Sequence, residues 1–360
     1  MLIVFSYGCD GGSSGSRGTP VGPTPAAAKF AYVTNLIDNT VSIYTVNSGT
    51  GSLTPAAPAT VAAGNGPFGI AVDPSNRFAY VTNTFDGTVS MYTINASSGS
   101  LTPTAPATVA TGNSPKKVVV DPSGKFVYVA NSNDNTVSMY TIDSSTGLLA
   151  PNSPAVVATG AQPQWIAVNP SGQSVYVTNS AAGTVSTYAI NSSTGNLTLS
   201  GTIAVPSGAE VDGLVVDPSG KYAYASDVDD EVSMYVIDSA TGILTLNNPA
   251  SVATGSLPGS PAVDPSGKFA YVPTGTDSGA IFMYTINSGI LTPNTPSNTL
   301  TGGAPQQLVV DSSGKFLFIT IANSNEVWTY GINGDGTLTM KGTAATGNSP
   351  TGIVLTGAAE

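Results

Sequence analysis

The sequence predicts an all-β protein: a closed seven-bladed β-propeller with four antiparallel strands in each blade. Three observations support this prediction. One aromatic residue recurs every 48 or 47 residues, each repeat holds four strand-like segments, and the two ends of the chain carry complementary parts of one repeat. A constant period of this length is typical of repeat architectures. The recurring aromatic residues are Tyr32, Tyr80, Tyr128, Tyr176, Tyr224, Tyr271 and Phe318.

The strand-like segments of one repeat are rich in β-branched and aromatic residues, which favour strands. In the second complete repeat they are "KVVVD" (117–121), "FVYVAN" (126–131), "TVSMYTID" (136–143) and "PAVVATG" (154–160). The breaks between them have turn chemistry. "DPSGK" supplies Asp, Pro and Gly for a tight turn, and "NDNT" suits a two-residue hairpin loop. Helical periodicity is absent, and the Ala-rich stretches contain too much Pro and Gly for helices.

The ends of the chain predict that the ring closes on itself. The first repeat begins at Lys29 without an inner strand, and residues 349–357, "SPTGIVLTG", supply a strand of that type without its continuation. Radial packing covers both faces of every four-stranded blade with its neighbours. We therefore expect the C-terminal strand to complete the first blade, with a propeller over 29–357, a preceding segment over 1–28 and a tail over 358–360.

The composition excludes some partners. Charged residues make up only 9% of the chain, so a surface of Ser, Thr, Asn and Gly is expected. The formal net charge of −11 repels phosphate backbones, and nucleic-acid binding is therefore not expected. The chain has no His, which removes the commonest general base, and its only arginines are Arg17 and Arg77.

The N-terminal segment suggests a lipid anchor. Cys9 is the only cysteine, which excludes an intrachain disulfide. It follows the apolar "MLIVFSYG" and precedes a Gly/Ser/Pro tract, an arrangement that resembles a bacterial lipoprotein signal. The resemblance implies lipidation of Cys9, a flexible tether over 10–28 and an extracytoplasmic location in the periplasm or at the cell surface. The alternative is an untethered tail with an incidental thiol. We expect a monomer.

The repeated phrases resemble a known family. "YVTN" at 32–35 and 80–83, together with "DPSGK", "NTVSMYTI" and "TGxLTP", is similar to the YVTN-repeat propellers of the seven-bladed, 6-phosphogluconolactonase-like lactonase family. The resemblance covers 29–357 and implies the fold. It also implies His, Arg and acidic residues near the central channel in the lactonase members. No catalytic residue can be carried over by position, because His is absent and Arg77 falls in a turn on the opposite face.

The repeats differ most where the chain enters each innermost strand, around the mouth of the channel. Variable residues on a rigid repeated frame are a usual place for recognition. We expect a small polar ligand or a protein or peptide to bind there; the alternative is a solvated rim. The candidate ligand-binding residues are Phe68, Lys116, Lys117, Gln164, Trp165, Glu210, Asp212, Gln306 and Gln307.

The fifth repeat is unusually acidic, in "GAEVDG" and in "SDVDDEVS". Crowded carboxylates suit Ca²⁺ or Mg²⁺. The candidate metal ligands are Asp212, Asp227, Asp229, Asp230 and Glu231; the alternative is a hydrated hairpin tip. By contrast, the Asn of "YVTN" and the Asp of "DPSG" recur in identical contexts and are interpreted as residues that anchor turns.

Together these features favour an extracytoplasmic propeller that binds a ligand or partner at the channel mouth without catalysis. The alternative is a lactone hydrolase that uses carboxylates of the fifth blade, with or without a divalent cation. A third hypothesis is a purely structural surface module.

Overall fold

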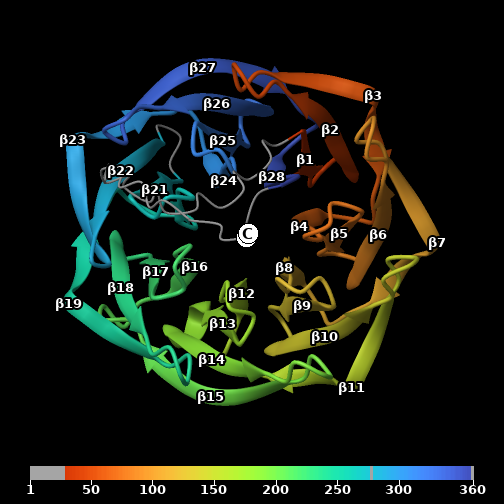
Figure 1. The fold of residues 1–360 in the computed structure, drawn as a ribbon, viewed down its shortest axis with the longest axis horizontal. Helices are drawn as coiled ribbons and strands as arrows, with labels where there is room; N and C mark the ends of the chain where they lie inside the picture. Colours follow the sequence, from red (N-terminus) through yellow and green to blue (C-terminus); the bar gives the residue numbers. More distant parts are fainter. Residues whose placement is uncertain (1–28, 276–278, 358–360) are drawn as a thin grey trace, which may run out of the picture.

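The computed structural model, which describes residues 29–275 and 279–357, is a ring of seven four-stranded antiparallel sheets around a central channel (Figure 1). This confirms the predicted fold class. The blades are numbered in chain order, and the strands of each blade are given from the channel outward. Blade 1 contains β28 (Pro350–Leu355), β1 (Phe30–Asn35), β2 (Thr40–Val46) and β3 (Leu53–Ala62). Blade 2 contains β4 (Pro67–Val72), β5 (Phe78–Asn83), β6 (Thr88–Ile94) and β7 (Leu101–Ala110). Blade 3 contains β8 (Pro115–Val120), β9 (Phe126–Asn131), β10 (Thr136–Ile142) and β11 (Leu149–Ala158).

The remaining blades follow the same order. Blade 4 contains β12 (Pro163–Val168), β13 (Ser174–Asn179), β14 (Thr184–Ile190) and β15 (Leu197–Ala204), with the short 3₁₀ helix η1 (Ser180–Ala182) in its hairpin. Blade 5 contains β16 (Val211–Val216), β17 (Tyr222–Asp227), β18 (Glu231–Ile237) and β19 (Leu244–Ala253). Blade 6 contains β20 (Ala262–Val263), β21 (Phe269–Thr274), β22 (Ala280–Asn287) and β23 (Ile290–Leu300). Blade 7 contains β24 (Pro305–Val310), β25 (Phe316–Ile321), β26 (Glu326–Ile332) and β27 (Leu338–Ala345).

Ring closure occurs as predicted. β28 pairs antiparallel with β1, so that Tyr32 lies opposite Val354 and Val33 lies opposite Ile353. The backbone N–H of Phe30 also donates a 3.1 Å hydrogen bond to the Thr356 hydroxyl. The last strand of the chain is therefore the innermost strand of the first blade.

The outermost strands begin earlier than the sequence indicated. In blade 3, residues 154–158 of the predicted segment 154–160 form the second half of β11, which starts at Leu149, ends at Ala158 and contains two prolines. Proline is compatible with an edge strand, because its missing N–H would face solvent there. A break in the pairing with β10, between Ser138 and Tyr140, lets the strand bend around the blade.

The recurring tyrosine joins neighbouring blades. Tyr128 is fully buried, and its hydroxyl donates a 2.9 Å hydrogen bond to the Gly195 carbonyl in the next blade. Tyr80 does the same to Gly147 at 3.0 Å. Tyr224 differs, because its hydroxyl is buried without a hydrogen-bond partner among the described residues.

This difference gives a paired prediction. Tyr128→Phe leaves the buried Gly195 carbonyl without its donor and is expected to lower the free energy of unfolding by about 1–2 kcal/mol. Tyr224→Phe removes an unsatisfied hydroxyl and is expected to be neutral or stabilising. The midpoints of urea denaturation of the two variants measure this. Equal losses would show that the inter-blade hydrogen bond contributes nothing specific.

The Asn and Asp residues interpreted as turn anchors have that role. Asn131 donates to the Thr136 and Ser138 hydroxyls and accepts from the backbone N–H of Gly112. Asp121 accepts from the backbone N–H groups of the Lys125–Phe126 pair at 2.8 and 2.7 Å, which closes the "DPSGK" turn. These residues therefore recur because each blade needs the same hydrogen bonds to hold its turns.

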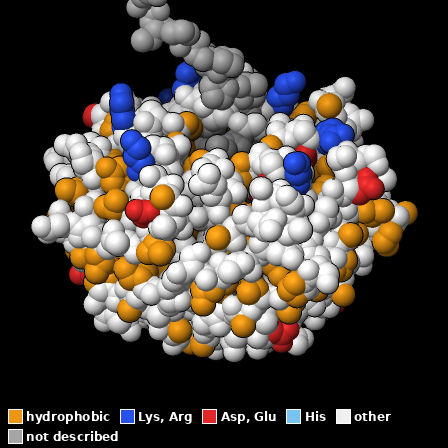
Figure 2. Space-filling model, turned by 60° about the horizontal axis from the view of Figure 1, so that its bottom comes forward, with side chains coloured by type: hydrophobic (Ala, Val, Ile, Leu, Met, Phe, Trp, Pro, Cys, Tyr) orange, Lys and Arg blue, Asp and Glu red, His pale blue; other side chains and the backbone are white. Residues whose placement is uncertain are grey.

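The loops that enter the innermost strands lie on the same face as the hairpins that join the second and third strands of each blade. In blade 3 the backbone N–H of Asn113 donates a 2.7 Å hydrogen bond to Asp134 in the hairpin. In blade 5 the Val228 N–H donates to the Glu210 carbonyl at 3.0 Å. In Figure 2 the Lys and Arg side chains gather around the upper rim of the molecule, whereas Asp and Glu side chains are spread singly among uncharged ones.

The N-terminal predictions are not addressed by the structure. Cys9 and the tether over 10–28 lie outside the described residues. Within the described part of the chain, no helix has the length and apolarity needed to cross a membrane.

Candidate functional site

The backbone aims the variable residues at the mouth of the channel. Five of the innermost strands begin with proline, and in four of these the pairing with the second strand breaks over the next two positions, which form a bulge. In blade 3, Pro115 pairs with Asn131, and regular pairing resumes only at Val118. The bulge therefore contains Lys116 and Lys117. β-Bulges re-aim side chains and are frequent beside functional sites.

Threonines of the "YVTN" phrases hold these bulges in place. The Thr178 hydroxyl accepts a 3.0 Å hydrogen bond from the Trp165 N–H and donates a 2.8 Å hydrogen bond to the Asp212 carbonyl in the next blade. Thr82 likewise donates to the Lys116 carbonyl at 2.6 Å. One buried hydroxyl thus fixes two mouth positions in adjacent blades relative to each other.

The structure gathers seven of the nine predicted mouth residues around one cavity of about 80 Å³. Lys116 lies beside this cavity, where it covers the Phe68 ring. Glu210 does not line it. The cavity is also lined by Ser260 and Thr351, from the corresponding segments of blades 6 and 1. The seven predicted residues that line it are Phe68, Lys117, Gln164, Trp165, Asp212, Gln306 and Gln307.

The two lysines of the mouth are held over aromatic rings. The Lys116 Nζ lies 4.7 Å from the centre of the Phe68 ring, and the Lys117 Nζ lies 4.8 Å from the Trp165 ring. Such cation–π contacts fix the position of an ammonium group without neutralising its charge. Positive charge is therefore presented at defined points in a protein whose net charge is strongly negative.

Asp212 is the acidic residue of the mouth cavity. Its side chain is open to the channel but enclosed by the surrounding blades, and this desolvation raises the pKa of the carboxyl. The positive charge of Lys116 partly opposes that effect. Burial in turn lowers the pKa of Lys116, opposed by the charge of Asp212. Both pKa values therefore move toward neutrality, which suits an acid–base pair.

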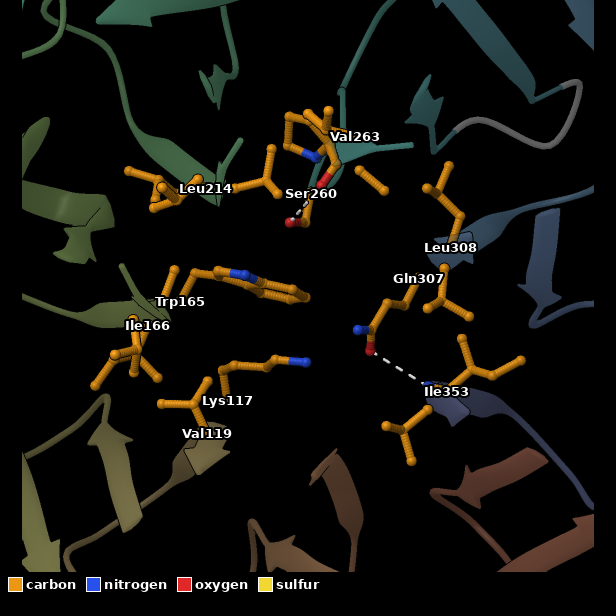
Figure 3. A pocket seen from close by; sticks show the side chains of 18 of the residues that line it. Lys117, Val119, Trp165, Ile166, Leu214, Ser260, Val263, Gln307, Leu308 and Ile353 are labelled. Carbon is orange, nitrogen blue, oxygen red and sulfur yellow. Dashed lines mark hydrogen bonds between the residues drawn. The ribbon is translucent and has the colours of Figure 1, made fainter. Parts of the chain in front are cut away.

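Side chains from opposite sides of the ring meet at the lower edge of the mouth. Figure 3 shows the Lys117 and Trp165 side chains extending side by side toward the Gln307 amide across the channel. The Gln307 Oε1 accepts a 3.3 Å hydrogen bond from the Ile353 N–H, which fixes the orientation of the amide. The arrangement offers a cation, an indole and an amide to one small ligand.

The acidic residues of blade 5 are not gathered as expected. Within residues 29–275 and 279–357, no group of three or more His, Cys, Asp or Glu side chains is placed to hold a metal ion. This applies to the predicted set of Asp212, Asp227, Asp229, Asp230 and Glu231.

The physical reason is that these carboxylates serve separate turns. Asp227 accepts hydrogen bonds from the Ser207 hydroxyl at 3.0 Å and from the Asp229 N–H at 3.2 Å. Asp230 has a φ of 65° and accepts from the Ser256 hydroxyl and the Leu257 N–H, both at 3.2 Å, toward blade 6. Asp212 instead faces the channel mouth.

Fold and mouth together define a class: seven-bladed propellers with a polar, carboxylate-bearing site at one end of the channel. The chain belongs to the seven-bladed lactonase β-propeller family, whose sequence pattern it matches over residues 21–213 and 213–355. The resemblance seen in the "YVTN" and "DPSGK" phrases is therefore confirmed.

Solved structures with the same fold include two Bacteroides proteins provisionally described as 6-phosphogluconolactonases. The one from Bacteroides uniformis is 18% identical, with a TM-score of 0.79 over 91% of this chain and 99% of that one. The one from Bacteroides fragilis is 19% identical, with a TM-score of 0.79 over 93% and 99%. A periplasmic gluconolactonase from Pseudomonas aeruginosa is 17% identical, with a TM-score of 0.75 over 92% and 99%. The comparison with curated proteins gives no match.

Proposed function

We propose that this protein is a lactone hydrolase and that its active site is the channel mouth. The observation that carries the proposal is the convergence of Asp212, Lys116 and Lys117 in and beside one cavity of a lactonase-family propeller. The altered pKa values of Asp212 and Lys116 add support, because acid–base groups work best when their pKa lies near the operating pH.

Each of these groups has a role in opening a lactone ring. The Asp212 carboxylate accepts a proton from water as the water oxygen bonds to the lactone carbonyl carbon. Lys117 and Lys116 stabilise the negative charge that forms on the carbonyl oxygen. The ring C–O bond then breaks, and the protonated Asp212 returns its proton to the leaving oxygen. The sum of these steps is water plus lactone giving a hydroxy acid.

The aromatic and amide groups of the mouth would orient the substrate. The cavity is lined by three side-chain amides, those of Gln164, Gln306 and Gln307. The Phe68 and Trp165 rings each lie against the ammonium group of one lysine. Polar groups in a shaped cavity hold the reacting carbonyl close to the attacking water.

Binding without chemistry, the function favoured by the sequence, uses the same mouth. The family assignment supports the hydrolase better, because the matched family is one of lactonases. The lipid anchor at Cys9, an extracytoplasmic location and a monomeric state remain predictions.

The test is the rate of ring opening for aliphatic and sugar-derived lactones, followed by acid release at constant pH with and without EDTA. We expect turnover above the buffer rate that survives EDTA, since the carboxylates of the described residues are not arranged around a metal. Folded protein that opens none of these lactones would overturn the proposal in favour of a binding module. Turnover abolished by EDTA and restored by Ca²⁺ or Mg²⁺ would contradict the metal-free mechanism.

A further inference from the structure

A second cavity, the lower chamber, lies directly below the mouth, inside the channel. It has a volume of about 130 Å³ and shares four lining residues with the mouth cavity: Lys117, Trp165, Ser260 and Gln307. The two cavities are therefore adjacent, with these four residues at their boundary.

The wall of the lower chamber is almost entirely aliphatic. It is formed by the innermost strands below their bulges, and Figure 3 shows side chains such as Val119, Ile166, Leu214, Leu308 and Ile353 arranged around the central space. Lys117 is the only charged residue among those that line it. An apolar wall of this kind gains little from water and favours apolar contents.

Part of this wall is left exposed within the described part of the chain. Val215, Val216 and Val263 are only half-buried, although they lie on the innermost strands of the ring. The innermost strand of blade 6 is reduced to Ala262–Val263, and the preceding Ser260 and Pro261 also line the chamber. Exposed aliphatic surface inside an enclosed channel costs free energy that an apolar ligand group would recover.

The two cavities together form an amphipathic site. The mouth supplies ammonium, carboxylate and amide groups, and the lower chamber supplies aliphatic contacts immediately beneath the Lys117–Trp165 pair. Ligand sites commonly combine an apolar lining with a few polar groups that set orientation. The matching ligand has a polar head and a short unbranched hydrocarbon chain.

We propose that the lower chamber binds an aliphatic chain attached to the group held in the mouth. As a statement about substrate this rests on the proposed lactone hydrolase, and it assigns the preferred lactones as those with a short alkyl substituent. The chamber has room for several water molecules, and hence for a chain of a few methylene groups. Each methylene buried there should improve affinity about fourfold.

Binding of linear carboxylates tests the chamber without requiring hydrolysis. The probes are butyrate, hexanoate and octanoate, whose carboxylate suits the lysines of the mouth and whose chain lengths differ by two methylenes. Isothermal titration of the full-length protein is expected to give a Kd that falls by about fourfold per methylene. A negative heat-capacity change that grows with chain length is also expected.

Two substitutions that fill the chamber serve as the variants. Ala167→Leu and Ala262→Leu each add volume at a half-buried lining position in a different blade. Both are expected to flatten the chain-length dependence, so that octanoate loses more affinity than hexanoate and hexanoate more than butyrate. Leu246→Phe, at an exposed position on the outermost strand of blade 5, is the control and should keep the full dependence. Native circular dichroism of each variant establishes that it is folded.

The outcomes separate this inference from the hydrolase proposal. Absence of binding by all three carboxylates, a flat series in the wild type, or an unchanged slope in both filled variants would overturn the chamber as a chain-binding site. A clear chain-length dependence in a protein that opens neither aliphatic nor sugar-derived lactones would support the chamber and overturn the hydrolase.

Discussion

A chain that ends at Asn348 is expected to lose the stable propeller. The missing segment contains β28, whose Ile353, Val354 and Leu355 side chains are almost completely buried. Burying one such side chain stabilises a protein by about 1.5–3 kcal/mol, so the three together contribute on the order of 6 kcal/mol. That is comparable with the whole stability of a typical domain. The truncation also exposes β1 and opens the ring.

Thermal unfolding followed by circular dichroism measures the effect. We expect the truncated chain to be unfolded at 25 °C or to melt more than about 10 °C below the full-length protein. Removal of residues 358–360 alone leaves β28 intact and serves as the control, for which the expected change is negligible. An unchanged melting temperature in the longer truncation would mean that β28 does not close the ring.

Asp212→Asn is expected to lower kcat for lactone hydrolysis by about 10²–10⁴ with a smaller change in KM. The amide has nearly the same shape as the carboxylate but cannot accept a proton from water, and general-base catalysis is worth roughly this factor. The backbone at this position is held by Thr178, so the mouth should keep its shape. Asp230→Asn is the matched control in the same blade, because Asp230 bonds to Ser256 and Leu257 away from the mouth cavity.

The pH dependence of kcat/KM gives an independent readout of the same pair. The active form has Asp212 ionised, so the rate rises with pH through the pKa of Asp212, which desolvation places above its ordinary value of 3.8. Lys116 must stay protonated, so the rate falls again at a pH below the ordinary lysine value of 10.5. Asp212→Asn should abolish this rise on the acidic side of the pH profile, its acidic limb. An acidic limb that persists in this variant would assign the base to another group.

Much of the fold could be predicted from the sequence, because the repeat dictates repeated contacts. Tyr128, Asn131 and Asp121 each occupy a fixed place in the phrase. Their equivalents in blade 2, Tyr80, Asn83 and Asp73, have the same kinds of partner. The convergence of mouth residues could also be predicted, since a ring places equivalent loop positions around one axis. The start of β11 could not, because prolines within an edge strand resemble a loop in the sequence.

Two features of the site could not be predicted, for geometric reasons. The acidic residues of blade 5 are adjacent in sequence, but turn conformation sends their side chains to different partners, as the positive φ of Asp230 illustrates. The innermost strands are rich in aliphatic residues. They gave no sign that ring closure leaves the aliphatic lower chamber at the centre, since that space depends on the radius of the ring.

The most direct test of the proposed site is a crystal structure of the protein soaked with a lactam, the ring-nitrogen analogue of a lactone that is not readily hydrolysed. We predict a lactam in the channel mouth, with its carbonyl oxygen within hydrogen-bond distance of the Lys116 or Lys117 Nζ and its ring carbon facing Asp212. A lactam bound at another surface, or a mouth that stays free of it at concentrations that saturate binding in solution, would contradict the account.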